Sequence, residues 1–150
     1  MIKLLRTDAT NLDFIELLIA LDADLKIRDG EEHSFYNQFN KLDTIKHVVV
    51  AYDNGIPIGC GAIKEYKDDI AEVKRMYVSP NGRRKGIASK ILIELELWAK
   101  ELSYIKCILE TGVNQPEAIT LYHKNGYQII ANYGPYKNAI NSVCFEKTLN

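Results

Sequence analysis

The sequence predicts an α+β domain with a mixed sheet, in which antiparallel strands pass into βαβ units. Two changes of hydrophobic period lead to this prediction. Apolar residues recur at helical spacing over 11–27 and again over 87–102, whereas 46–78 carries β-branched runs separated by turn residues. No repeat, linker or low-complexity tract interrupts the 150 residues. We therefore expect one domain over 1–150 with a single core.

The N-terminal half is expected to supply four strands and two helices. A short strand over 2–6 precedes a helix over 11–27, for which Asp8 and Thr10 are candidate caps, and a shorter helix is predicted over 31–40. Asn54-Gly55 between two β-branched runs is a strong hairpin signal. A second turn over 67–69 returns the chain into a strand over 70–78, which gives three consecutive antiparallel strands.

The C-terminal half alternates between helices and strands. Ser79-Pro80-Asn81-Gly82 ends the sheet segment, and a helix follows. Its apolar stripe includes Trp98, which we expect in the core. The predicted elements after this helix are a strand over 104–110, a helix over 117–124 and strands over 127–130 and 142–148.

Composition excludes several classes of function. Nineteen basic and twenty acidic residues give a net charge of −1, so no overall positive field is available to hold nucleic acid or an anionic membrane. No apolar run approaches the roughly 20 residues of a membrane span, and the first residues lack the apolar core of a signal peptide. We expect a cytoplasmic protein with no nucleic-acid or membrane partner.

The cysteines and histidines give no metal-site pattern. Cys60, Cys107 and Cys144 are far apart and lie among apolar or small residues, which favours buried, reduced thiols. The three histidines stand far from them in sequence, so we expect no metal. His123 follows Tyr122 directly and should point away from it on a helix.

A basic segment between the predicted strand over 70–78 and the following helix is the strongest candidate for chemistry. Arg83-Arg84-Lys85-Gly86-Ile87-Ala88 places three positive charges and a glycine where the first N–H groups of a helix lack internal partners. By itself the hexapeptide fits a pyrophosphate cradle or a solvated basic turn. Neither common nucleotide fingerprint is present.

This segment resembles a family signature. Arg83-x-x-Gly86-x-Ala88 matches the [RQ]-x-x-G-x-[GA] pyrophosphate loop of the GCN5-related N-acetyltransferases (GNAT), 71–78 is similar to the family's fourth strand, and 109–127 is similar to its second half. The tail over 132–147 and Glu110-Thr111-Gly112 resemble a subgroup of small stand-alone bacterial members. The resemblance implies the GNAT acyl-CoA N-acyltransferase fold, a mostly antiparallel twisted sheet of about seven strands with about four helices.

The resemblance also implies an activity. Members are acyltransferases that move an acetyl group from acetyl-CoA to a primary amine of a small molecule or peptide by direct attack, without a covalent enzyme intermediate, and homodimers are common. N–H groups over 84–88 would hold the pyrophosphate, and Tyr77 and Val78 would pair with the pantetheine arm. The acetyl-CoA-binding residues so implied are Met76, Tyr77, Val78, Arg83, Arg84, Lys85, Gly86, Ile87, Ala88, Ser89, Asn114 and Tyr122. Many members carry glycine at the position of Arg84. An arginine side chain is tolerable there if the residue has an ordinary φ, outside the left-handed region that favours glycine.

Two residues match catalytic positions of the family. Tyr122 matches the tyrosine that protonates the departing thiolate, and the alternative is a core aromatic. Glu72 matches a glutamate that acts as general base in some members, and the alternative is a surface carboxylate paired with Lys74 or Arg75. Asn114 matches a position that contacts pantetheine, or caps the following helix.

The acceptor side is less defined by the resemblance. Tyr133, Tyr136 and Ser142 are candidates for the acceptor pocket, with Tyr36 opposite, and for each of them structural packing is the alternative. A non-catalytic acyl-CoA-binding module is the alternative function. It would share the pyrophosphate loop and differ at Tyr122 and the base.

Overall fold

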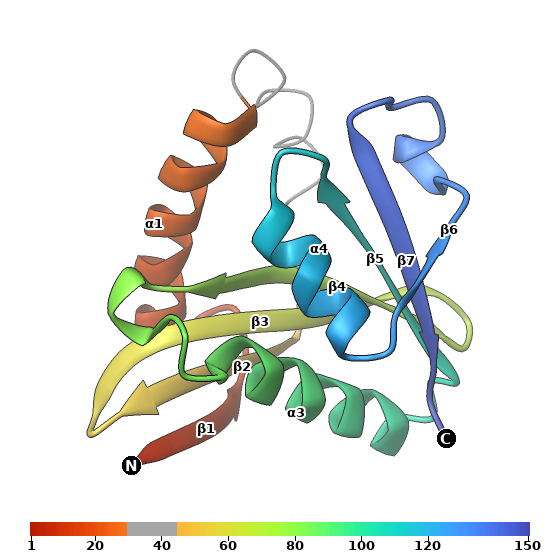
Figure 1. Ribbon diagram of the computed structural model, residues 1–150. Coiled ribbons are helices and arrows are strands. Elements are labelled where there is room, and N and C mark those ends of the chain that lie inside the picture. The colour runs from red at the N-terminus through yellow and green to blue at the C-terminus, as the bar shows by residue number, and fades with distance from the viewer. Residues whose placement is uncertain (30–44) are drawn as a thin grey trace.

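The computed structural model describes residues 1–29 and 45–150. Seven strands form one sheet in the order β1-β2-β3-β4-β5-β7-β6, with helices on both faces (Figure 1). The elements are β1 (Ile2–Thr7), α1 (Leu12–Asp29), β2 (His47–Asp53), β3 (Ile56–Lys67), β4 (Ile70–Val78), α3 (Ile87–Glu101), β5 (Lys106–Gly112), α4 (Pro116–Lys124), β6 (Gln128–Ile130) and β7 (Ser142–Thr148), with 3-10 turns η3 (Pro80–Gly82) and η4 (Gly134–Tyr136).

The predicted fold class is confirmed. Seven strands were expected and seven are found, and the described ranges hold three α-helices where about four were expected. The helix predicted over 31–40 lies outside the described residues. The Asn54-Gly55 hairpin forms with positive φ at both residues (50° and 85°), as a type I′ turn requires.

The sheet opens between β4 and β5. Strands β1 to β4 pair antiparallel, and β4 pairs parallel with β5 only from Ile70↔Lys106 to Glu72↔Ile108. Beyond Glu72 the two strands diverge, while β5 continues antiparallel to β7 up to Gly112↔Ser142. Figure 1 shows this divergence, with α4 lying over it. The β5-facing edge of β4 after Glu72 is therefore available to a ligand, because no described strand pairs with it.

A β-bulge bends β4 at the point of divergence. Its register with β3 runs from Ala62↔Lys74 to Cys60↔Tyr77, so β4 carries one extra residue. Arg75 in this interval has φ 62°, in the left-handed region. Bulges redirect side chains and are common beside active sites.

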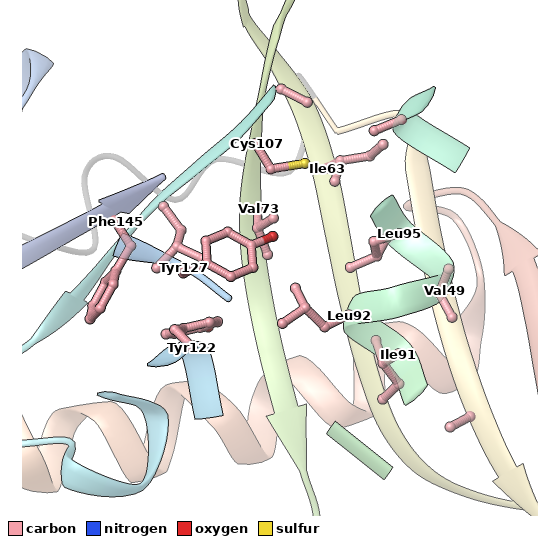
Figure 2. Close-up of a cluster of buried hydrophobic side chains, with 14 of the residues drawn as sticks. Val49, Ile63, Val73, Ile91, Leu92, Leu95, Cys107, Tyr122, Tyr127 and Phe145 are labelled. Carbon is pink, nitrogen blue, oxygen red and sulfur yellow. The ribbon is translucent and has the colours of Figure 1, made fainter. Parts of the chain in front are cut away.

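Two apolar layers cover the sheet. On one face α3 and α4 pack on the larger cluster, in which Leu92, Leu95, Tyr122, Tyr127 and Phe145 are buried (Figure 2). On the other face α1 packs Phe14 and neighbouring leucines on β2 and β3. Close packing of α3 requires Gly61, because a Cβ there would lie 2.5 Å from Met76 Sδ and 2.9 Å from Leu95 Cδ1.

The structure tests several other sequence predictions. All three cysteines are buried free thiols, as expected. Trp98 lies at the edge of the core, half-buried between the Arg6 guanidinium and the His47 ring, and not within it. In the described residues no helix is long and apolar enough to cross a membrane.

Candidate active site

An open cleft of about 890 Å³ runs through the gap between β4 and β5. Its walls come from β4, β5, the N-terminal end of α3, helix α4 and one side of α1. Ten of the twelve predicted acetyl-CoA-binding residues line it, together with Glu72 and Tyr136; the ten are Met76, Tyr77, Val78, Arg83, Arg84, Gly86, Ile87, Ala88, Ser89 and Tyr122.

The start of α3 is arranged to receive an anion. Gly86 has φ 73° and is the N-cap residue, and the first helical hydrogen bond runs from the Lys90 N–H to its carbonyl at 3.1 Å. The N–H groups of Ile87, Ala88 and Ser89 therefore precede the helical ladder, at the positive end of the helix dipole. A Cβ at Gly86 would meet no atom within 4 Å, so the backbone is open to a ligand.

The basic side chains of this loop have different roles. The Arg83 Nε–H donates to the Val78 carbonyl at 2.9 Å, which ties the loop to the end of β4. Lys85 does not line the cleft, because its Nζ turns to Asp53 Oδ2 at 3.8 Å. Arg84 lines the cleft, but its φ is 65° and not ordinary. The arginine therefore occupies a left-handed position that glycine adopts without strain.

Tyr122 reaches the cleft from the last turn of α4. Only 5% of the residue is exposed, and its ring packs against Tyr127 and Phe145 at 5.7 Å between centroids (Figure 2). Burial and, secondarily, the charge of Glu110 raise the pKa of Tyr122. The phenol therefore carries its proton at neutral pH. Tyr122 is therefore a core aromatic that also lines the cleft, and its catalytic role stays a prediction.

The structure places Asn114 in the connection between β5 and α4. It is exposed in the turn before α4, and it does not line the cleft. The helix begins at Pro116 with Gln115 as its N-cap residue, so the prediction that Asn114 caps α4 is wrong. Proline at the first helical position displaces the cap by one residue, because it fixes φ and needs no N–H partner there.

Glu72 is buried and not a surface carboxylate. Its exposed fraction is 5%, and the Tyr133 hydroxyl donates to its Oε2 at 2.6 Å. Lys74 Nζ lies 4.0 Å from the other oxygen and 3.4 Å from the Tyr136 hydroxyl oxygen, to which it donates. Burial lowers the pKa of Lys74, more than the charge of Glu72 raises it. Glu72 thus faces the cleft within a polar cluster built by β4 and the η4 turn.

The other predicted acceptor residues divide into three groups. Tyr136 lines the cleft, and it is 3% exposed. Tyr133 and Ser142 lie behind the cleft wall, where each hydroxyl donates to a carboxylate that does line it, Glu72 and Glu110 respectively. Tyr36 lies outside the described residues.

Comparison with known proteins identifies the family. A family model described as an acetyltransferase (GNAT) domain matches residues 44–129, which is more than half of the chain. The chain belongs to the GNAT family. The IAA acetyltransferase of Azospirillum brasilense is 37% identical to this chain over 102 residues, which cover 67% of each chain. The uncharacterized N-acetyltransferase YsnE of Bacillus subtilis is 34% identical over 93 residues, which cover 61% of this chain and 62% of YsnE. This GNAT chain spans half to two thirds of the length of the curated relatives it matches.

Solved GNAT structures share the whole fold. A putative acyl-CoA N-acyltransferase from Klebsiella pneumoniae is 32% identical, with a TM-score of 0.84 over 100% of this chain and 99% of its own. The PaiA N-acetyltransferase of Thermoplasma acidophilum, solved with coenzyme A, is 19% identical with a TM-score of 0.73 over 99% of both chains. A GNAT acetyltransferase of Elizabethkingia anophelis, solved with acetyl-CoA, is 20% identical with a TM-score of 0.72 over 99% of this chain and 98% of its own. The last two likenesses establish the fold.

Sequence reasoning did not assign Lys74 and Glu110 to the GNAT cleft. Lys74 follows Glu72 by two residues on one strand, so alternation places both side chains on one face. Glu110 belongs to the Glu110-Thr111-Gly112 segment that marked the bacterial subgroup. A carboxylate at the end of a strand that borders a cleft was the available signal.

Proposed function

We propose that the protein is an acetyl-CoA-dependent N-acetyltransferase that acetylates a primary amine of a small molecule or peptide. One observation carries the proposal. A continuous cleft joins the open N-terminus of α3 to Tyr122 and Glu72 through the divergence of β4 and β5. A candidate anion site, an edge of β4 with which no described strand pairs, a candidate proton donor and a carboxylate are thus arranged along one path. Family membership and the ligands of the two solved relatives support acetyl-CoA as donor.

The residues of the loop fit the pyrophosphate of acetyl-CoA. The N–H groups of Ile87, Ala88 and Ser89 would donate to it, and Gly86 leaves room for it because no atom occupies the space where its Cβ would be. Arg84 adds positive charge at the same end of the cleft. The edge of β4 over 76–78 would pair with the amides of the pantetheine arm like an added strand.

Acetyl-CoA supplies an activated thioester, and side chains of the cleft act as general base and general acid. Glu72 accepts a proton from the charged amine, whose freed lone pair forms the new N–C bond. A backbone N–H near Tyr77 stabilises the negative charge that develops on the carbonyl oxygen. Tyr122 gives its proton to the sulfur as the C–S bond breaks and the electron pair moves to sulfur. The nitrogen loses a second proton after attack, which balances the proton given by Tyr122.

The donor site is tested by calorimetric titration with acetyl-CoA, ATP and NADH. The variants are Gly86→Glu and Gly86→Gln, which carry the same backbone strain and nearly the same bulk but differ by one charge. We expect wild type to bind acetyl-CoA selectively, and the glutamate to weaken binding more than the glutamine. Equal binding of the three ligands, or equal effects of both variants, would contradict a pyrophosphate site at Gly86.

The catalytic part is tested by acetyl transfer to a panel of amines. Tyr122→Phe should lower kcat by about tenfold to a thousandfold and leave the Kd for acetyl-CoA within about twofold, since the phenol acts on the leaving sulfur. Binding of acetyl-CoA without transfer to any amine would favour the binding-module function. Unchanged kcat in Tyr122→Phe would remove the tyrosine from the mechanism.

A further inference from the structure

The hydroxyl of Tyr122, the proposed proton donor, takes its direction from ring packing. Among the residues that the structure describes, no group forms a hydrogen bond with this hydroxyl. The Tyr122 ring packs against the rings of Tyr127 and Phe145, each at 5.7 Å between centroids (Figure 2). Whatever holds these two rings therefore also sets the direction of the Tyr122 hydroxyl.

Tyr127 is fixed at three points. Its backbone N–H donates to the Tyr122 carbonyl at 2.9 Å. Its hydroxyl donates to Glu96 Oε2 at 2.9 Å, and the Lys147 ammonium lies 5.8 Å from the centre of its ring. Burial raises the pKa of Tyr127, so the phenol remains a donor at neutral pH. Phe145 has no polar side-chain atom, so of the two rings only that of Tyr127 has a directional anchor.

Glu96 is itself held from outside the cleft. Its second oxygen, Oε1, accepts a hydrogen bond from Lys147 Nζ at 2.8 Å, and the glutamate side chain is only 10% exposed. Both carboxylate oxygens are thus engaged, which fixes the direction of the carboxylate. Glu96, Tyr127 and Lys147 do not line the cleft. A ligand in the cleft therefore does not touch this network, which reaches the site only through the Tyr122 ring.

The network joins the two helices that border the cleft. Glu96 belongs to α3, whose N-terminus is the candidate pyrophosphate site, and Tyr127 lies between α4 and β6. The hydrogen bond between them therefore fixes the proposed proton donor of α4 relative to the helix that would bind the donor substrate. Such support matters, because a displacement of about 1 Å in a catalytic group can lower a rate about a hundredfold.

We propose that Tyr127 and Glu96 are positioning residues, which hold the Tyr122 ring so that its hydroxyl points at the sulfur of the leaving thiolate. Lys147 completes the network by holding Glu96. None of the three touches the reacting atoms, so they act on the rate through Tyr122. This inference rests on the proposed N-acetyltransferase function, with Tyr122 as the proton donor.

The test is a double-mutant cycle on acetyl transfer with Tyr127→Phe and Tyr122→Phe. Tyr127→Phe keeps the ring and removes the hydroxyl that donates to Glu96. It should lower kcat by about threefold to thirtyfold and leave the Kd for acetyl-CoA within about twofold. In the Tyr122→Phe background the same change should lower kcat by less than about twofold, because no donor hydroxyl is left to misplace.

Tyr104→Phe is the matched control. The Tyr104 hydroxyl also donates to a glutamate, Glu65 Oε1 at 3.4 Å, and the residue packs against the same core cluster, but it does not line the cleft. Tyr104→Phe should leave kcat within about twofold of wild type. Unchanged kcat in Tyr127→Phe, or an equal loss with and without the Tyr122 hydroxyl, would overturn the inference and leave the acetyltransferase function standing.

A second variant covers the case in which Tyr127→Phe does not fold. Lys147→Met keeps the apolar stem and removes the ammonium that holds Glu96. It should lower kcat by a smaller factor than Tyr127→Phe, again only when the Tyr122 hydroxyl is present, and unchanged kcat would overturn the inference. Unchanged kcat in Tyr122→Phe would remove the proton donor and the positioning residues together. Absence of transfer to every amine would remove the acetyltransferase function as well.

Discussion

Replacing Tyr133 with phenylalanine isolates a single hydrogen bond to the proposed base. The Tyr133 hydroxyl donates to Glu72 Oε2 at 2.6 Å, within the range of bonds to an ionised carboxylate. Burial and the charge of Glu72 raise the pKa of Tyr133, so its phenol remains a donor at all moderate pH values. Phenylalanine retains the ring, which packs edge-on against Tyr66 and Tyr136 at 5.2 and 5.8 Å. The change therefore removes the hydrogen bond without leaving a cavity.

The expected loss of stability in Tyr133→Phe follows from the strength of this hydrogen bond. A hydrogen bond to a charged group contributes about 1.5–3 kcal/mol, so the free energy of unfolding should fall by about that amount in urea titrations. Glu72 also loses the group that directs it toward the cleft. Each 1.36 kcal/mol of lost transition-state stabilisation is a factor of ten in rate, so kcat should fall by about tenfold or more.

The pH profile of kcat distinguishes a positioning role from a purely structural one. An alkylamine with a pKa near 10 is charged at pH 7 and needs a base, whereas at pH 10 much of it is already neutral. The loss in Tyr133→Phe should therefore be largest near pH 7 and shrink toward pH 10, as it should in Glu72→Gln. Tyr66→Phe is the matched control, since it removes a hydroxyl from the same tyrosine cluster and leaves the Tyr133–Glu72 bond intact. A kcat loss that is constant with pH would refute the reasoning and remove Glu72 as the base.

Two further predictions concern the loop and the thiols. Arg84→Gly should leave the free energy of unfolding unchanged or raise it by up to about 1 kcal/mol, because relief of the φ of 65° outweighs the extra freedom of glycine in the unfolded chain. Gly86→Ala should lower the free energy of unfolding by about 1 kcal/mol, because alanine is strained at the positive φ of this position. Denaturant titration of both variants checks the contrast. Burial raises the pKa of Cys60 and Cys107 to about 12 and that of Cys144 to about 11, so at pH 8 the reactive thiolate is scarce and alkylation of the native protein should be at least about a hundredfold slower than in urea. Fast labelling of any native cysteine would contradict their burial.

The two halves of the site differ in how far the sequence predicts them. The pyrophosphate loop depends on a contiguous segment, in which a glycine with positive φ and basic residues stand at the start of a helix, and such local features are visible in the chain itself. The acceptor side depends on contacts between distant segments. Tyr133 and Glu72 are 61 residues apart, and Ser142 and Glu110 are 32 apart. No local pattern relates them.

The sequence alone determined the hairpin at Asn54-Gly55, the amphipathic helices, the buried cysteines and the Arg83–Ala88 loop, because turn chemistry, hydrophobic period and helix termini act over a few residues. Only the tertiary structure decided that Glu72 is buried, that Arg84 adopts a left-handed conformation and that Glu72 and Glu110 both line one cleft. These features arise where β4 bulges and parts from β5 after a single short parallel ladder. At that divergence α3 packs against both strands and β7 pairs with β5, so the site depends on contacts between segments far apart in the sequence.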